Sequence, residues 1–317
     1  MVGKTARPRL AGIHLIGVAA LLPALLAMPA AAAAATTGGA PTPGASPPAH
    51  GSTTGTPASE APSAGAISLV SAQATPRKSF FYGFRYPSLR FSIGSSQPQN
   101  DLQIDIVNSA GEVVRSFYRN DIAPNTEVGI RWDGTTAEGR PARNGRYTFR
   151  IGAQGATQAA ARAAASSEPL SLGFALYGYA FPVLAPHDFG DTAARFGAPR
   201  SSHTHQGQDT MAACGTPLVA ARGGTVQYSG YEGNAGNYIV IDGKGTGLDF
   251  MYAHLVQPSP LKTGEPVRTG QPIGIVGETG DATACHLHFE IWTAPGWYEG
   301  GSPIDPLPYL EKWDRYS

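Results

Sequence analysis

The sequence predicts a mainly β protein in which antiparallel sheets form two globular segments. Glycine and proline number 40 and 27 among 317 residues, and this abundance favours turns and short strands over long helices. Apolar and polar residues alternate in two separate stretches, 78–152 and 225–292, as they do in half-buried strands. A chain of this length accommodates two domains together with unstructured segments.

The N-terminus has the order of features typical of a secretory signal peptide. Basic residues come first, an apolar run follows to about residue 28, and alanines at 30–35 offer small-residue cleavage sites. We expect residues 1–35 to be removed on export, which leaves no stable membrane span. An uncleaved membrane anchor is the alternative, but Pro23 and Pro29 interrupt the apolar run.

Two segments of low complexity flank the first predicted domain. Residues 36–75 are mostly Ala, Gly, Pro, Ser and Thr, with Glu60 as the single formal charge. Too few large apolar side chains are present to offset the entropy lost on ordering, so we expect a flexible linker. Residues 154–168 are rich in alanine and are expected to form a helical or flexible connector.

Residues 76–153 carry the pattern of a small antiparallel β-sandwich. Leu102, Ile104 and Ile106 alternate with polar residues, as expected for a strand with one buried face. Asn144-Gly145 is a strong signal for a two-residue hairpin.

Part of this segment resembles the Ig-like domain of the flagellar hook-cap protein family. The resemblance rests on Trp132-Asp133-Gly134 and on Asn144-Gly145-Arg146-Tyr147, and it implies an Ig-like sandwich. Trp132 is expected in the core, and the segment contains no catalytic constellation.

Residues 169–317 form the second predicted domain, an antiparallel sheet with glycine-rich loops. The expected strands, each bounded by Gly or Pro clusters, are 225–228, 238–242, 248–254, 273–276 and 286–292. Helical periodicity is almost lacking in this part of the sequence.

Three short motifs of the second domain have the composition of a catalytic metal site. They contribute His205, Asp209, His254, His286 and His288. Two imidazoles and one carboxylate would hold zinc and leave one position for water, which is the stoichiometry of a catalytic site rather than a structural one. Two histidines then remain for proton transfer and charge stabilisation.

Strand alternation supports this grouping, because residues i and i+2 face the same side of a strand. His286 and His288 would point into one cleft, and His254 would share a face with Tyr252. If residues 205–209 are extended, both ligands of that motif also share a face, and Gly207 adds no side chain between them. A lone histidine is more often structural than a ligand, so two are left out of the site: His187 and His203.

Cys214 and Cys285 are the only cysteines, an even number in a chain expected to be exported. Cys214 lies five residues after Asp209, and Cys285 directly precedes His286. A metal that joins these segments therefore also brings the two sulfur atoms together. We expect a Cys214–Cys285 disulfide, since an oxidising compartment favours it. Thiolate ligation of zinc is the alternative.

The histidine motifs resemble those of the lysostaphin/LytM-like zinc endopeptidases. The pattern is His-x-Gly-x-Asp at 205–209, Tyr-x-His at 252–254 and His-x-His-Phe-Glu at 286–290, and no motif position departs from it. The resemblance covers about residues 180–308. Framework segments also match: Gly215–Ala220, Gly224–Val226, Gly270–Gly274 and Gly277–Gly280.

This resemblance implies a β-rich domain of the duplicated hybrid motif type, with a long groove, that cleaves peptide bonds in bacterial peptidoglycan. Carried over by position, one zinc ion per chain would be bound by His205, Asp209 and His288. His286 would be the general base, and His254 would stabilise the transition state. Zinc would polarise the scissile carbonyl and lower the pKa of its bound water.

The expected function is therefore that of a secreted, cell-wall-associated zinc endopeptidase, a monomer acting on stem or cross-bridge peptides. One alternative is a non-catalytic wall-binding or amidase-activating protein that keeps the groove, and another is a hydrolase of glycine-rich proteins outside the wall. Nucleic-acid binding is not expected, because Lys+Arg and Asp+Glu are both 23 and leave no basic excess. The bond cleaved stays open, since loop shape around the groove decides it.

Overall fold

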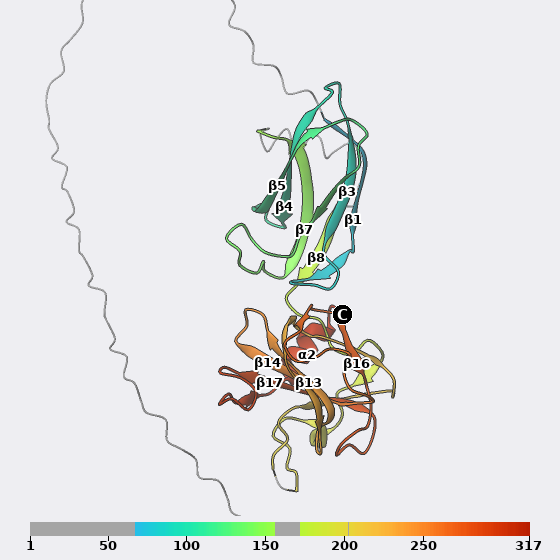
Figure 1. Ribbon diagram of the computed structural model, residues 1–317, viewed down its shortest axis with the longest axis vertical. Helices are drawn as coiled ribbons and strands as arrows, with labels where there is room; N and C mark the ends of the chain where they lie inside the picture. Colours follow the sequence, from blue (N-terminus) through green and yellow to red (C-terminus); the bar gives the residue numbers. More distant parts are fainter. Residues whose placement is uncertain (1–66, 156–171, 202) are drawn as a thin grey trace, which may run out of the picture. The chain divides into compact units, whose positions relative to one another are not determined.

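The computed structural model describes residues 67–155, 172–201 and 203–317 (Figure 1). The expected signal peptide, most of the expected linker and nearly all of the expected connector lie outside these ranges. Among the described residues, no helix has the length and apolar character needed to cross a membrane. The strands pair almost entirely in antiparallel fashion, which confirms the predicted mainly β fold.

The first domain is a β-sandwich of two sheets. The smaller sheet has the order β1-β3-β6, with bounds Ser68–Thr75, Ser88–Gly94 and Val128–Arg131. The larger sheet has the order β2-β8-β7-β4-β5, with bounds Lys78–Phe80, Gly173–Tyr177, Gly145–Ala153, Asn100–Asn108 and Val113–Ile122. Its neighbouring strands are antiparallel except for β2 and β8.

The core of the sandwich draws apolar side chains from both sheets. Leu102, Ile104 and Ile106 of β4 are fully buried and share one apolar cluster with residues of β3 and β6, as their alternation predicts. Trp132 is 1% exposed and packs edge-on against Tyr147, with 5.2 Å between the ring centroids. Its expected place in the core is confirmed.

Two expectations for this domain are wrong. The linker expected over 36–75 ends earlier, because residues 68–75 form strand β1. This strand has only a weak apolar pattern, and it is stabilised by backbone hydrogen bonds to β3. Asn144-Gly145 does not form a two-residue hairpin, because Gly145 begins β7, which pairs with β4 and β8. Asn144 Oδ1 instead accepts a hydrogen bond of 2.7 Å from Gly178 N, just after β8.

The second domain is built on an eight-stranded antiparallel sheet (Figure 1). The order is β15-β12-β13-β14-β17-β10-β9, and β18 pairs with β17. In that order the bounds are Pro266–Val267, Gly224–Glu232, Gly236–Gly243, Leu248–Leu255, His286–Thr293, Gln208–Ala212, His187–Asp188 and, for β18, Pro303–Ile304. The remaining elements are the strand pair β11 and β16, a 3-10 helix η1 and helix α2: Pro217–Val219, Pro272–Ile275, Thr192–Ala194 and Leu307–Asp314. All five expected strands are present.

The two faces of strand β17 have different surroundings. Leu287, Phe289 and Ile291 are fully buried in the main apolar core, and α2 contributes Leu310 and Trp313 to the same core. The alternate residues of β17, which include both of its histidines, point to the opposite face. The register of β14 and β17 therefore sets the histidines beside a second, small apolar cluster: Val240, Met251 and Ala253.

Candidate metal centre

The three predicted ligands converge on two adjacent strands. Asp209 of β10 lies directly opposite His288 of β17 in the antiparallel register, and His205 is in the loop before β10. His205 Nε2 is 3.0 Å from Asp209 Oδ1 and 2.9 Å from His288 Nδ1, and the last two atoms are 2.9 Å apart. Their side chains are 5, 14 and 13% exposed for His205, Asp209 and His288.

Hydrogen bonds at the other ring nitrogens determine which atoms face this triangle. His205 Nδ1 lies 2.8 Å from Arg195 O, and a carbonyl only accepts, so Nδ1 carries the hydrogen and Nε2 keeps its lone pair. His288 Nε2 lies 2.9 Å from Glu290 Oε1, which leaves Nδ1 facing Asp209. Three electron-pair donors thus point at one another, and a cation among them removes their mutual repulsion.

The donor set fits zinc. Imidazole nitrogen and carboxylate oxygen bind zinc at about 2.0–2.2 Å, so a tetrahedral ion holds neighbouring ligand atoms roughly 3.3–3.5 Å apart. The three residues would need to open the observed triangle by only about half an ångström to reach that spacing.

Anionic neighbours also favour a cation at this position. Burial alone would lower the pKa of His288, but hydrogen bonds with Asp209 and Glu290 outweigh burial and raise it to about 9. Burial would raise the pKa of Asp209, but hydrogen bonds from His205 and His288 hold it well below its usual range. The same negative surroundings attract a metal ion, which must displace this proton when it binds.

Two residues that contact the candidate ligands were not singled out in the sequence. Arg200 Nη2 lies 3.1 Å from Asp209 Oδ2, so that the other carboxylate oxygen is left for the triangle. No local pattern marks Arg200, because the contact depends on how the loop before β10 folds. Glu290 ends the His-x-His-Phe-Glu motif, and that position was the one available signal for its contact with His288.

Gly207 is required between two of the ligands for steric reasons. A Cβ atom at this position would lie 2.5 Å from Phe289 O and 2.8 Å from His288 Cε1, well inside the usual contact distance of about 3.5 Å. Any side chain here would therefore displace His288 from the triangle.

The two other histidines of the motifs lie beside the triangle. His286 Nε2 is 3.6 Å from Asp209 Oδ1, and the ring centroids of His286 and His254 are 4.7 Å apart. Both rings donate Nδ1–H to a carbonyl at 2.8 Å, Ala284 O for His286 and Thr279 O for His254. Nε2 is therefore the nitrogen of each neutral ring that can accept a proton.

His254 reaches this position through a backbone conformation that strand alternation does not anticipate. Alternation places it on the face of Phe250 and Tyr252, which are buried in the main core. The expected shared face is wrong, because His254 has a φ of 60° and its ring packs against His286 on the opposite face. Burial, and next the charge of His288, lower the pKa of His254 to about 4.

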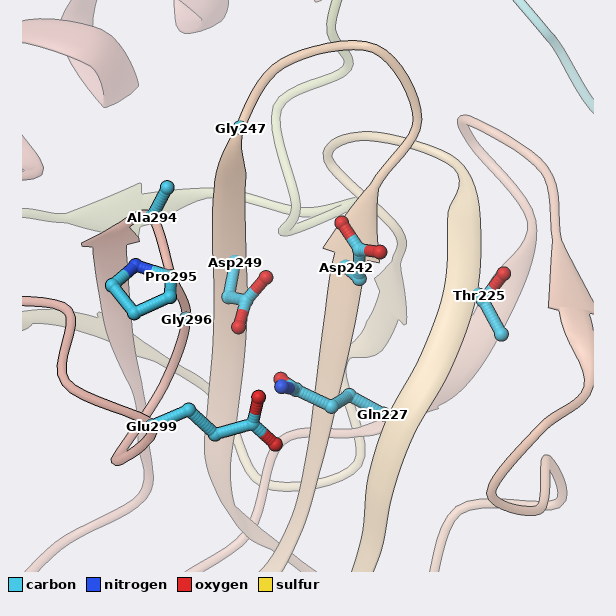
Figure 2. A pocket seen from close by; sticks show the side chains of 9 residues that line it. All are labelled: Thr225, Gln227, Asp242, Gly247, Asp249, Ala294, Pro295, Gly296 and Glu299. Carbon is cyan, nitrogen blue, oxygen red and sulfur yellow. The ribbon is translucent and has the colours of Figure 1, made fainter. Parts of the chain in front are cut away.

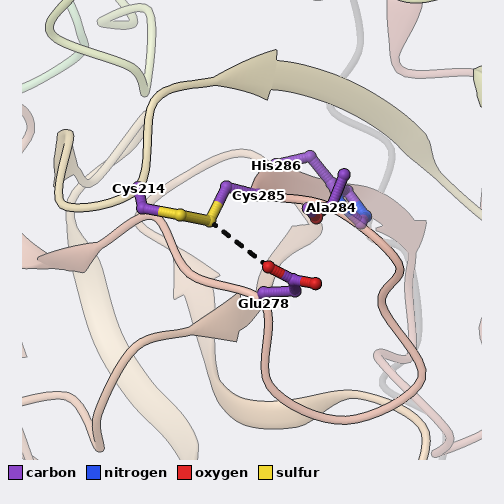
Figure 3. Close-up of a disulfide and its surroundings, with 5 residues drawn as sticks. All are labelled: Cys214, Glu278, Ala284, Cys285 and His286. Atoms are coloured by element: carbon purple, nitrogen blue, oxygen red, sulfur yellow. Dashed lines mark hydrogen bonds between the residues drawn. A yellow bond between two sulfur atoms is a disulfide. The ribbon is translucent and has the colours of Figure 1, made fainter.

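Cys214 and Cys285 form a disulfide with their Cα atoms 5.2 Å apart, as expected (Figure 3). Because both sulfur atoms are in this bond, neither is available as a thiolate ligand. Glu278 Oε2 lies 3.9 Å from Cys285 Sγ, and this is a contact rather than a hydrogen bond because a disulfide sulfur carries no hydrogen. The bridge fixes the chain immediately before His286.

The two histidines left out of the site are not among the triangle residues. His187 Nδ1–H donates a hydrogen bond of 3.0 Å to Ala185 O, and its Nε2 is 3.4 Å from Asp314 Oδ2. Its ring packs against Phe181 at 4.4 Å between centroids, which is the structural role expected of it. His203 is outside the group of potential metal ligands.

A separate cavity of about 240 Å³ lies over strands β12, β13 and β14 and the loop after β17 (Figure 2). Three carboxylates, those of Asp242, Asp249 and Glu299, line it, and none of the predicted site residues does. Burial raises the pKa of Asp249, which also accepts a hydrogen bond of 2.7 Å from the backbone N–H of Trp297. The loop of Trp297 therefore borders this acidic cavity.

Comparison with known families supports both domain resemblances. Residues 203–306 match the model of peptidase family M23, and residues 88–157 match that of the FlgD Ig-like domain. The chain thus contains a peptidase M23 domain and an FlgD Ig-like domain, as the motifs indicated.

Several curated proteins are similar over about a third of this chain. The peptidoglycan DD-endopeptidase ShyC of Vibrio cholerae is 41% identical over 114 residues, which are 34% of this chain and 26% of ShyC. The DD-carboxypeptidase/endopeptidase Mpg of Neisseria meningitidis is 36% identical over 103 residues, 32% of this chain and 22% of Mpg. The chain thus spans about a quarter of the length of these relatives. Among solved structures, the catalytic domain of lysostaphin from Staphylococcus simulans is 28% identical, with a TM-score of 0.34, over 40% of this chain and 92% of that one.

Proposed function

We propose that this chain is an exported zinc-dependent endopeptidase that hydrolyses peptide bonds in bacterial peptidoglycan. The observation that carries the proposal is the convergence of His205 Nε2, Asp209 Oδ1 and His288 Nδ1 within 2.9 to 3.0 Å of one another. The match to a peptidase family and the similarity to proteins named as peptidoglycan endopeptidases support the reaction and the substrate class. The disulfide is consistent with an oxidising compartment outside the cytoplasm.

The proposed roles follow from the hydrogen-bonding state of each ring. Zinc, when bound by the three ligands, supplies a Lewis acid that polarises a carbonyl and acidifies a water molecule. His286 has Nε2 as its free nitrogen close to Asp209, so it accepts the water proton and later delivers it to the leaving amine. This assigns His286 as the general base.

The proposed role of His254 depends on the protonation state of its ring. Its Nδ1–H donates to Thr279 O, so the neutral ring keeps its lone pair on Nε2. In that state Nε2 accepts a proton and does not donate one, so His254 stabilises an oxyanion only after it has gained a proton. We therefore propose that His254 stabilises the developing oxyanion when its ring carries a proton, beside His286 as the general base.

The test is to measure zinc content and peptide release from purified peptidoglycan for the chain without residues 1–35. About one zinc per chain and metal-dependent release are expected. His288→Ala should lose metal and activity together, whereas His286→Ala should lose activity but keep its zinc, because His286 is not a ligand in this scheme. Equal zinc loss in both variants would contradict this division of roles. An absence of both zinc and release would favour the non-catalytic wall-binding function.

Mass spectrometry of the released fragments identifies the bond. The chain is incubated separately with two kinds of purified peptidoglycan. One kind has glycine cross-bridges, and the other has direct links between D-Ala and a diamino acid. Release from only one wall type assigns the substrate, and cleavage of glycine-rich proteins without release from either wall would move the proposal to a substrate outside the wall.

A further inference from the structure

Glu290 is a buried carboxylate without a neighbouring Lys or Arg among the described hydrogen-bond and ion-pair partners. Its residue exposure is 5%. A carboxylate so far from water is costly unless hydrogen-bond donors surround it. The identity of these hydrogen-bond donors therefore indicates the role of Glu290.

Three N–H groups converge on this carboxylate. His288 Nε2 lies 2.9 Å from Oε1, while the indole nitrogens of Trp292 and Trp297 donate to Oε2 at 2.6 and 3.3 Å. Trp292 is 4% exposed, and Trp297 packs against Tyr228 with 5.3 Å between ring centroids. The two indoles thus hold one oxygen in place, and the other oxygen is left for the imidazole.

We infer that Glu290 is a positioning residue that sets the tautomer and orientation of His288. As long as Oε1 takes the hydrogen of Nε2, the lone pair of Nδ1 faces His205 and Asp209. Hydrogen-bonded carboxylates behind a histidine ligand commonly fix the ring and raise its basicity as a ligand. The inference rests on the proposed zinc site, because it concerns how one of the three ligands is presented.

Glu290→Gln is the decisive variant because it keeps the volume but not the acceptors. An amide has one oxygen and one NH₂ group, and three donors now compete for that oxygen. If the oxygen stays with the two indoles, the NH₂ group faces His288 Nε2. The ring must then place its hydrogen on Nδ1, where a metal ligand needs a lone pair. A weaker zinc site follows without any change in the ligands themselves.

The experiment measures zinc dissociation constants by chelator competition for the unaltered chain, Glu290→Gln and Asp249→Asn. Asp249 is a matched control, since it is 5% exposed, lies on the same sheet and binds the same loop through Trp297 N, yet touches no ligand. Glu290→Gln should bind zinc about 10- to 100-fold more weakly, and Asp249→Asn should bind it as the unaltered chain does. Equal affinity for all three, or equal weakening in both variants, would overturn the inference.

The tautomer is read independently from imidazole ¹⁵N NMR spectra of the unaltered, zinc-loaded chain. The inference requires a hydrogen on Nε2 of His288 and none on Nδ1, and the opposite pattern overturns it even if Glu290→Gln fails to fold. Neither measurement uses hydrolysis. Zinc binding that is insensitive to Glu290 would therefore refute this inference alone, whereas an unaltered chain without zinc affinity would refute the proposed function as well.

Discussion

At the residue scale, His254 combines a side chain of the proposed site with a strained backbone. Its φ of 60° lies in the left-handed region, which costs a residue with a Cβ atom roughly 1–2 kcal/mol. The conformation turns the ring from the core face of β14 to the face of His286. Strain of this kind persists where the surrounding structure enforces it, and it concentrates at functional sites.

This strain predicts a reversed order of stability for two substitutions. Glycine inside a strand is ordinarily less stable than alanine by about 0.5–1 kcal/mol. At position 254 the left-handed φ removes that disadvantage, so His254→Gly should be more stable than His254→Ala by about 1 kcal/mol. Urea unfolding of both variants measures the difference, and both should lose hydrolysis.

The neighbouring position provides the control. Ala253 lies in the same strand, is 1% exposed and is not among the residues with positive φ. At this position alanine should be more stable than glycine, so Ala253→Gly should lower the free energy of unfolding. If alanine proves more stable than glycine at both positions, the left-handed conformation of His254 is not a source of strain.

At the scale of elements, strands β4 and β7 are joined by a buried ion pair on the face opposite their apolar residues. Asp105 and Arg150 lie directly opposite each other in the register, with 2.7 Å between Oδ2 and Nη2 and side-chain exposures of 9 and 11%. Ser116 and Gln103 donate to the other carboxylate oxygen at 2.7 and 2.9 Å. Breaking such a pair leaves a buried charge without its partner.

Arg150→Met should therefore destabilise the first domain by about 3 kcal/mol, at the lower end of the range for a broken buried pair because two donors remain on Asp105. The double variant Asp105→Asn with Arg150→Met should recover part of that loss, since no buried charge is then uncompensated. Hydrogen exchange of peptides from β4 and β7 reports on this domain specifically. A double variant that is no more stable than Arg150→Met would contradict the argument.

The same pair predicts a pH dependence with a definite sign. Burial would raise the pKa of Asp105, but hydrogen bonds from Gln103, Arg150 and Ser116 together lower it. A carboxylate whose pKa is lower in the folded chain than its unfolded value of about 3.9 stabilises the fold above that pH. The stability difference between the unaltered chain and Asp105→Asn should thus be constant at neutral pH. It should shrink as the pH falls below about 4, and a difference that grows on acidification would show that the sign is wrong.

At the scale of the whole molecule, local patterns predicted most strands and the residues that converge at the candidate metal centre, but not the contacts that depend on long-range pairing. The alternation of Leu102, Ile104 and Ile106 was enough to predict β4, because it reflects one buried face. Strand β1 was missed because its own sequence has little apolar alternation, and its backbone hydrogen bonds come from pairing with β3. The contact of Arg200 with Asp209 could not be predicted either, since it exists only after the loop before β10 has folded.

Two cross-links of different kinds close nearly the same long loop of the second domain. The disulfide joins residues 71 positions apart, and the proposed metal site joins Asp209 to His288 across 79. They act on different states, however. A disulfide stabilises mainly by restricting the unfolded chain, whereas a metal that binds the native chain stabilises it by mass action.

This difference predicts that the disulfide and bound zinc contribute additively to the free energy of unfolding. Replacing Cys214 and Cys285 by serine should lower the free energy of unfolding by about 4 kcal/mol at most, the chain-entropy value for a loop of this length. The loss should be the same with and without zinc, and the zinc dissociation constant of the native protein should not change. Urea unfolding of both forms, together with chelator competition, measures these quantities. A weaker zinc site in the serine variant would instead mean that the bridge before His286 acts on the native state and shapes the site itself.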